Sequence, residues 1–235
     1  MSAQVTTGPL HGRGVVDVRM MVVAHTSFRR ELKLSGPAVR RVPEGDHQRV
    51  DEVAEHVDLW LGLVHHHHTI EDELLWDKLT QRVPAELAPL VGLMEAQHAA
   101  VAGLLAGCPP LLTSWRSSAA TSAGSRLADH LDELAAALCE HLEAEETRVL
   151  PLMARHIRQE EWDEFTERGM ESIPKSMLLT GFGMMLYEGD PDALALEIAK
   201  LPAPLRPVLP WLARRAFRQY ARRIHGTPAP ARGTI

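Results

Sequence analysis

The chain has 235 residues, of which 45% are hydrophobic and 24% are charged, as in ordinary water-soluble globular proteins. Its formal net charge of −6 gives no support to nucleic-acid binding, and no unbroken apolar run reaches the roughly eighteen residues of a membrane span. With only two cysteines, we expect neither a disulfide framework nor a cysteine-rich zinc site, and we expect a cytoplasmic location. The unusual number is thirteen histidines, which are unevenly distributed.

The spacing of apolar residues predicts long helices joined by short connections. The first helix is expected from Val15 to Leu34, where Ser35-Gly36-Pro37 ends it. The second is expected to begin near Asp46, a common N-cap residue, and to run towards Arg82, with Pro84 marking its end. Such a length allows an interruption within the helix.

Two further long helices follow. The third is expected from Ala85 to Ala106, ahead of a glycine and two prolines within residues 107–110. A connection rich in Ser, Thr, Ala and Gly (113–125) leads to the fourth helix, about Ser125 to His156, in which Pro151 predicts a kink or an early end. Four long helices with short connections predict an all-α, up-and-down four-helix bundle.

The sequence changes character after His156. Shorter helices are expected over 160–168, over 174–187, after Asp190-Pro191 and over 204–225. The predicted organisation is a flexible N-terminus (1–14), a four-helix bundle (15–156), accessory C-terminal helices (157–225) and a disordered tail (226–235).

Two segments of the predicted bundle repeat the pattern HxxxE. His67 is followed four residues later by Glu71 in the second helix, and His141 is followed by Glu145 in the fourth. Residues four apart lie on one face of an α-helix, one turn from each other. Each pair could therefore bind the same metal ion or a pair of metals, and the repeat predicts ligation by facing helices.

The first and third predicted helices each carry one inward-looking histidine. His25 follows the apolar run 20–24, and His98 lies in the middle of the third helix. Imidazole and carboxylate ligands suit first-row transition metals, and two such ions need bridging carboxylates to offset their charge. We therefore predict that Glu71 and Glu145 bridge two metal ions.

These motifs resemble those of the hemerythrin-like (HHE cation-binding) domain. The resemblance rests on His25 and His98 together with the runs Leu63–Glu73 and Glu140–Glu146, and it covers about Val15 to His156. It implies a non-heme centre of two iron ions, inside a helical bundle, that meets O2, NO or H2O2.

The sequence departs from the oxygen-carrying hemerythrins at two points. Those proteins use a histidine pair spaced by four on the third helix, whereas Met94 holds the earlier position here and only His98 remains. They also use the carboxylate five residues after the last histidine, here Glu146, whereas iron-sensing relatives use the fourth, Glu145, and a second ligand at the position of His68. These changes weaken the expectation of reversible oxygen carriage. The resemblance implies the metal ligands His25, His67, His68, Glu71, His98, His141 and Glu145.

Other polar residues have simpler roles. His65 and His66 point away from the HxxxE face and are expected to face solvent or to support the ligands. His56 and His130 lie about 16 Å along the helix from the ligands, which excludes them from one compact site and favours a structural role. Glu95 is either an acceptor for a ring N–H of a ligand or an exposed helix carboxylate.

The sequence thus predicts a non-heme diiron protein that binds or reacts with a small oxidant, O2, NO or H2O2. Sensing, detoxification and catalysis all fit this prediction, so whether the protein is an enzyme stays open. One alternative is a diiron oxygenase or oxidase whose C-terminal helices shape a pocket for an organic substrate. Another is an iron-binding, storage or sensing protein without catalysis.

Overall fold

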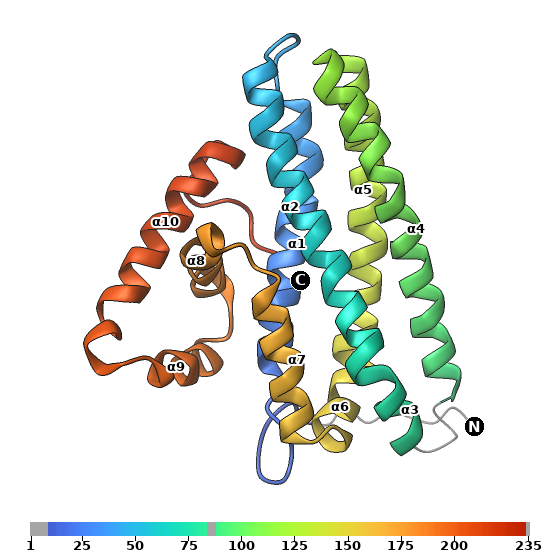
Figure 1. Ribbon diagram of the computed structural model, residues 1–235, viewed down its shortest axis with the longest axis vertical. Helices are drawn as coiled ribbons and strands as arrows, with labels where there is room; N and C mark the ends of the chain where they lie inside the picture. Colours follow the sequence, from blue (N-terminus) through green and yellow to red (C-terminus); the bar gives the residue numbers. More distant parts are fainter. Residues whose placement is uncertain (1–8, 84–87, 234–235) are drawn as a thin grey trace.

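The computed structural model describes residues 9–83 and 88–233, which form helices and connecting segments without any β-strand. The expected all-α class is therefore confirmed. Four long helices lie side by side, α1 packing against α2 and α5, and α4 packing against the same two (Figure 1). Their bounds are α1 Arg19–Arg40, α2 His47–Glu71, α4 Ala88–Ser118 and α5 Thr121–Ala144.

Helix α1 continues through Ser35-Gly36-Pro37, where the sequence predicted its end. Gly36 lies so close to α5 that an added Cβ would overlap the side chain of Asp132. The Ser35 hydroxyl also donates to the backbone carbonyl of Glu31, at 2.7 Å. Packing of α1 on α5 therefore outweighs the local helix-breaking preference of glycine and proline.

Helix α4 is also longer than predicted, because it runs through Pro109 and Pro110. Both prolines are exposed, so their rings lie on the outer side of the helix. The inner side stays buried along the whole length, at Val101, Leu105, Cys108, Leu112 and Trp115. The predicted connection over 113–125 shrinks to Ala119-Ala120, where a φ of 47° at Ala119 turns the chain sharply into α5.

Among the described helices, α4 alone is long and apolar enough to cross a membrane by length and composition. Its segment Pro89–Ser118 has a mean hydropathy of 1.3. Polar or charged residues lie within this segment, among them Glu95, His98 and Arg116. The same helix packs on α2 and α5 and carries His98 on its inner side.

A π-helical turn interrupts the second and fourth helical runs at the end of each HxxxE motif. In the second run, α2 is followed by the π-helical Asp72–Trp76 and by α3 (Asp77–Arg82). In the fourth, α5 is followed by the π-helical Glu145–Val149 and by α6 (Leu150–His156), with Pro151 in the first turn of α6. Such π turns are frequent at functional sites, because they re-aim neighbouring side chains.

The C-terminal helices lie on the side of the bundle that α1 and α2 form (Figure 1). Asp190 caps one of them by accepting the backbone N–H groups of Asp192 and Ala193, which agrees with the predicted start at Asp190-Pro191. The bounds are α7 Gln159–Glu171, α8 Leu178–Glu188, α9 Pro191–Lys200 and α10 Val208–His225, with short 3-10 helices at Lys175–Met177 and Ala203–Leu205.

The tail after α10 was expected to be disordered, but it packs on the protein as far as Gly233. The Tyr187 hydroxyl donates to the carbonyl of Pro230 at 2.7 Å, and the Gly233 N–H donates to the Glu188 carboxylate at 2.8 Å. An added Cβ at Gly233 would overlap the backbone of α1. The backbone of Pro230 and Gly233 makes the contacts that hold this segment in place, and the amino-acid composition of the segment does not predict them.

Some predictions reach beyond the described residues. The predicted end of the second helix at Pro84 and the start of the third at Ala85 lie within 84–87, outside the described residues. Most of the flexible N-terminus predicted for 1–14 and the last two residues of the chain are outside them as well.

Candidate metal centre

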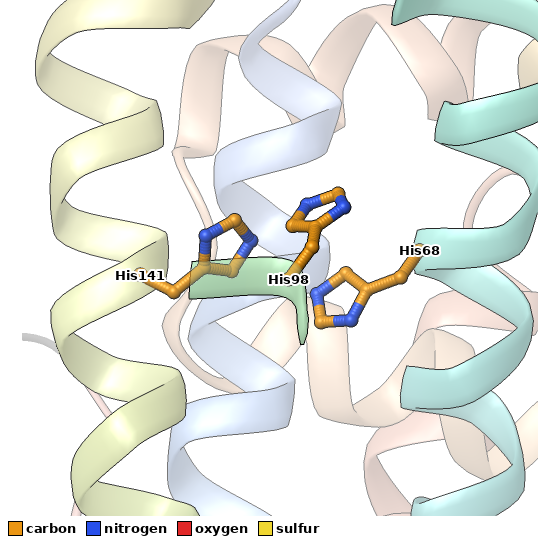
Figure 2. Close-up of side chains that lie close together, drawn as sticks. All are labelled: His68, His98 and His141. Atoms are coloured by element: carbon orange, nitrogen blue, oxygen red, sulfur yellow. The ribbon is translucent and has the colours of Figure 1, made fainter. Parts of the chain in front are cut away.

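The two HxxxE motifs meet the histidines of α1 and α4 inside the bundle. Two groups of three residues, His68 with His98 and His141, and His25 with His67 and Glu71, each bring their ligand atoms within 4.8 Å of one another. Figure 2 shows the first group, whose imidazole rings come from three helices and point towards one another. We call the following seven residues, all predicted from the sequence, the metal cluster: His25, His67, His68, Glu71, His98, His141 and Glu145.

Glu71 belongs to the second group and also approaches the first. Its Oε1 is 3.1 Å from His67 Nε2, and its Oε2 is 3.9 Å from His98 Nε2. The Nε2 atoms of His25 and His67 also face each other, at 3.1 Å. One carboxylate thus approaches a histidine of each group.

Glu145 occupies the matching position on the other side. Its Oε2 is 3.7 Å from His25 Nε2 and 3.6 Å from His141 Nε2, and its side chain is fully buried. Glu146 points elsewhere: its Oε1 lies 3.0 Å from His25 Nδ1 and accepts a hydrogen bond from Arg29 at 2.7 Å. The geometry therefore brings Glu145, rather than Glu146, between the two groups.

Two carboxylates around the metal cluster orient its histidines. Asp72 Oδ1 lies 3.1 Å from His98 Nδ1, as Glu146 lies beside His25 Nδ1. When these carboxylates accept the Nδ1–H, each ring keeps its Nε2 lone pair for the interior. Neither residue is predicted for this role from the sequence, although each directly follows the glutamate of an HxxxE motif. Glu95, for which this role is one of the two predicted alternatives, is exposed.

The described residues of the chain supply no positive charge that would balance two ionised carboxylates in the metal cluster. Burial lowers the pKa of His67 and His141 to about 3, so both imidazoles are neutral at pH 7. Burial also raises the pKa of Glu71 to about 8. Burial and the neighbouring charge of Glu71 together raise the pKa of Glu145 well above its usual range. Ionisation of both carboxylates therefore needs a positive charge between them.

Hydrogen bonding in the metal cluster is incomplete as well. Among the described residues, neither oxygen of Glu71 or Glu145 has a hydrogen-bond partner. The same is true of the Nε2 atoms of His68, His98 and His141. Buried polar atoms are rarely left without partners, because desolvation without a hydrogen bond is costly. Neutral imidazoles and carboxylates aimed at one space fit first-row transition-metal ions.

A third buried group contains Glu31, His56 and His225, whose ligand atoms also lie within 4.8 Å of one another. Here the carboxylate is already paired: Arg30 Nε donates to Glu31 Oε1 at 2.5 Å, and His225 Nε2 lies 2.8 Å from Oε2. The Tyr220 hydroxyl lies 2.6 Å from His56 Nδ1. We call these five residues the docking cluster, because they connect α10 to α1 and α2.

The other histidines lie outside the metal cluster. His130 donates from Nε2 to the backbone carbonyl of Leu104 at 2.8 Å, which links α5 to α4. His65 is exposed, and His66 is half-buried with its Nε2 3.3 Å from the carbonyl of Arg168. None of these three histidines belongs to a metal-capable group of the described residues.

A family model described as the hemerythrin HHE cation binding domain matches residues 16–153. This span is more than half of the chain and includes the whole metal cluster. The chain belongs to the hemerythrin HHE family. The comparison with curated proteins and the comparison with solved structures each found no match. In this member of the family, helices α7 to α10 follow the matched span.

Proposed function

We propose that the protein is a non-heme diiron protein that binds or reacts with a small oxidant, O2, NO or H2O2. The observation that carries this proposal is the position of Glu71 and Glu145. Each carboxylate approaches one histidine in each of the two ligand groups. Two metal ions held this closely need bridging carboxylates, and iron suits a mixed imidazole–carboxylate ligand set. The helical bundle of this proposal has the up-and-down order α1, α2, α4, α5.

The ligands divide into two sets. His68, His98 and His141 would hold one ion, and His25 with His67 would hold the other, while the two glutamates would be shared. Bound iron would supply a redox change and an exchangeable coordination position for a small oxidant. Helix α4 provides one imidazole, that of His98, because the buried Met94 occupies the position one turn earlier. Helix α2 provides two imidazoles, those of His67 and His68.

The protein around these ligands has two tasks. Asp72 and Glu146 keep a proton on Nδ1 of His98 and His25, which makes the opposite nitrogen of each ring a better ligand. Buried apolar residues such as Val64, Ile70 and Leu142 exclude bulk water from the cluster. A dry site strengthens the electrostatic influence of the ligands on the bound ions.

The proposal is tested by aerobic purification after expression in iron-rich medium, with metal content and the visible spectrum measured together. We expect about two irons per chain and a ferric absorption in the visible range. His67→Ala and His141→Ala should lose both, whereas His65→Ala, which changes an exposed neighbour on the same helix, should lose neither. One zinc per chain, or no metal, with an unchanged fold would contradict the proposal.

The oxidant is tested on the iron-loaded protein by mixing with H2O2 or NO in the absence of any organic substrate. We expect a change in the visible spectrum and consumption of the oxidant, both missing in His141→Ala. A spectrum that responds to neither these oxidants nor O2 would leave an iron-binding protein without this reactivity.

A further inference from the structure

A cavity of about 820 Å³ lies between the bundle and the C-terminal helices, and it reaches the metal-cluster residue His67. Helices α1 and α2 form one wall, with Phe28 and Trp60, and helices α7 to α9 form the other. Its volume is that of a site for a small organic molecule, commonly about 300–1,000 Å³. The wall formed by α7 to α9 lies beyond the matched family span.

The lining of this cavity is apolar and adaptable. Phe165 and Trp162 of α7 face it, and methionines supplied by α1 and α8 include Met21 and Met184. Methionine side chains adjust to ligands of varied shape. Met170 and Leu196 also line the cavity and are 52% and 53% exposed, which places apolar side chains at its opening.

The charged residues that line the cavity define the ligand further. Four carboxylates, those of Asp17, Asp163, Glu167 and Glu197, face a single described lysine, Lys200. Lys200 already donates to Glu197 at 2.6 Å. Asp17 in turn pairs with Arg19 at 2.7 Å. The lining thus offers no free described cation to receive an acidic head group, and the two carboxylates without a described ion-pair partner, Asp163 and Glu167, repel an anion.

We propose that this cavity binds an uncharged molecule with a long hydrocarbon chain, of the class of fatty alcohols. The chain lies between the aromatic side chains of the bundle wall and those of α7, and the ligand contacts His67. The bound molecule therefore lies against His67, one of the residues of the metal cluster.

Gly181 allows a sharp test, because it lines the cavity from α8 and a Cβ added there meets nothing within 4 Å. In Gly181→Phe, and in the smaller Gly181→Leu, the new side chain fills the cavity. Gly103 of α4 is the matched control, since it is a helical glycine with equally open space and does not line the cavity. Replacing glycine inside a helix also favours the helix, at both positions alike.

The experiment uses the full chain and the uncharged fluorescent probe N-phenyl-naphthylamine, displaced by dodecanol or by dodecanoate. We expect the probe to bind the wild type and Gly103→Phe equally, and to bind both Gly181 variants about 10-fold more weakly. Dodecanol should displace the probe at concentrations about 10-fold lower than dodecanoate, because dodecanoate would bury an unpaired charge.

Several results would overturn the inference. One is a probe affinity of the folded Gly181 variants equal to that of the wild type, and another is stronger displacement by dodecanoate than by dodecanol. A third is release of the probe when the protein forms a dimer, which would assign the cavity to a second copy of the chain. Iron content is measured in the same samples. If the protein lacks iron but the probe still binds the wild type more tightly than the Gly181 variants, the diiron proposal fails and the cavity assignment stands. If the protein holds two irons per chain but both Gly181 variants bind the probe as tightly as the wild type, only the cavity assignment is contradicted.

Discussion

The metal cluster and the docking cluster both bring buried glutamate and histidine side chains together, with different outcomes. In the docking cluster, Arg30 and His225 contact the two oxygens of Glu31, although one nitrogen of each lacks a partner among the described residues. In the metal cluster, the oxygens of Glu71 and Glu145 meet no described lysine or arginine. A charge supplied by the chain therefore distinguishes a structural cluster from one that needs an external cation.

The carboxyl pKa values of the two clusters shift in opposite directions. Burial would raise the pKa of Glu31, but the hydrogen bond from His225 and the charge of Arg30 outweigh it and lower the pKa to about 2. Burial raises the pKa of Glu71 to about 8, because no arginine opposes it. The chain therefore balances the charge of Glu31 by itself, whereas ionised Glu71 and Glu145 need a cation from outside the chain.

The largest expected effect concerns the docking cluster. Glu31→Gln removes the negative charge that pairs with Arg30 and His225, so it should lower the free energy of unfolding by about 3–5 kcal/mol at pH 7. Urea denaturation measures this change, with the exposed Glu133→Gln of α5 as control. The iron content should stay unchanged in Glu31→Gln; a loss of iron with no loss of stability would reverse our assignment of the two clusters.

The pH dependence of the same variant sharpens the comparison. The folded-state pKa of Glu31 is depressed from 4.5 to about 2, so its contribution is present above pH 4.5 and is lost as the pH falls towards 2. The shift corresponds to about 3 kcal/mol. Denaturation from pH 7 to pH 2.5 should show the wild type and Glu31→Gln converging in stability. A constant difference across this range would show that the charge of Glu31 is not responsible.

A smaller effect is expected from the carboxylates that orient the metal-cluster histidines. Asp72→Asn and Glu146→Gln leave every proposed ligand in place but weaken the acceptor for the Nδ1–H of His98 or His25. The affinity for Fe(II), measured by titration under anaerobic conditions, should fall about 10-fold to 100-fold. Glu143→Gln, an exposed carboxylate beside the second HxxxE motif, is the control. Equal affinities in all three variants would leave Asp72 and Glu146 without this role.

The smallest effect on stability is expected inside the metal cluster itself. In the metal-free protein, Glu71→Gln removes a carboxyl group that burial already keeps protonated near pH 7. Its free energy of unfolding should therefore stay within about 1 kcal/mol of the wild type, or increase. Thermal denaturation with and without chelator measures this. A loss as large as that of Glu31→Gln would contradict the contrast between the two clusters.

The sequence predicted which side chains come together inside the bundle, because helical periodicity ties spacing to direction. His67 with Glu71 and His141 with Glu145 share one helix face whatever the rest of the fold does, and His68 is the next residue along. The role of Asp72 was missed, although its position directly after Glu71, matched by Glu146 after Glu145, is visible in the sequence.

Tertiary packing decided what the sequence failed to predict. Helix α1 passes Pro37 because Gly36 packs on α5, and α4 passes Pro109 and Pro110 because its inner side stays buried. The docking cluster pairs Glu31 with His225, 194 positions away, which no local pattern reveals. The cavity beside His67 has the same origin, since its two walls come from segments far apart in the chain.

We propose that Glu71 and Glu145 hold two iron ions together between the five histidines. Electron paramagnetic resonance of the oxidised, iron-loaded protein, with iron quantified in the same sample, tests this proposal. Two bridged ferric ions couple magnetically, so we expect a nearly silent spectrum at about two irons per chain. In Glu71→Gln and Glu145→Gln, a signal of isolated high-spin ferric ions should appear or the iron should be lost. A full isolated-ferric signal in the iron-loaded wild type would contradict the account.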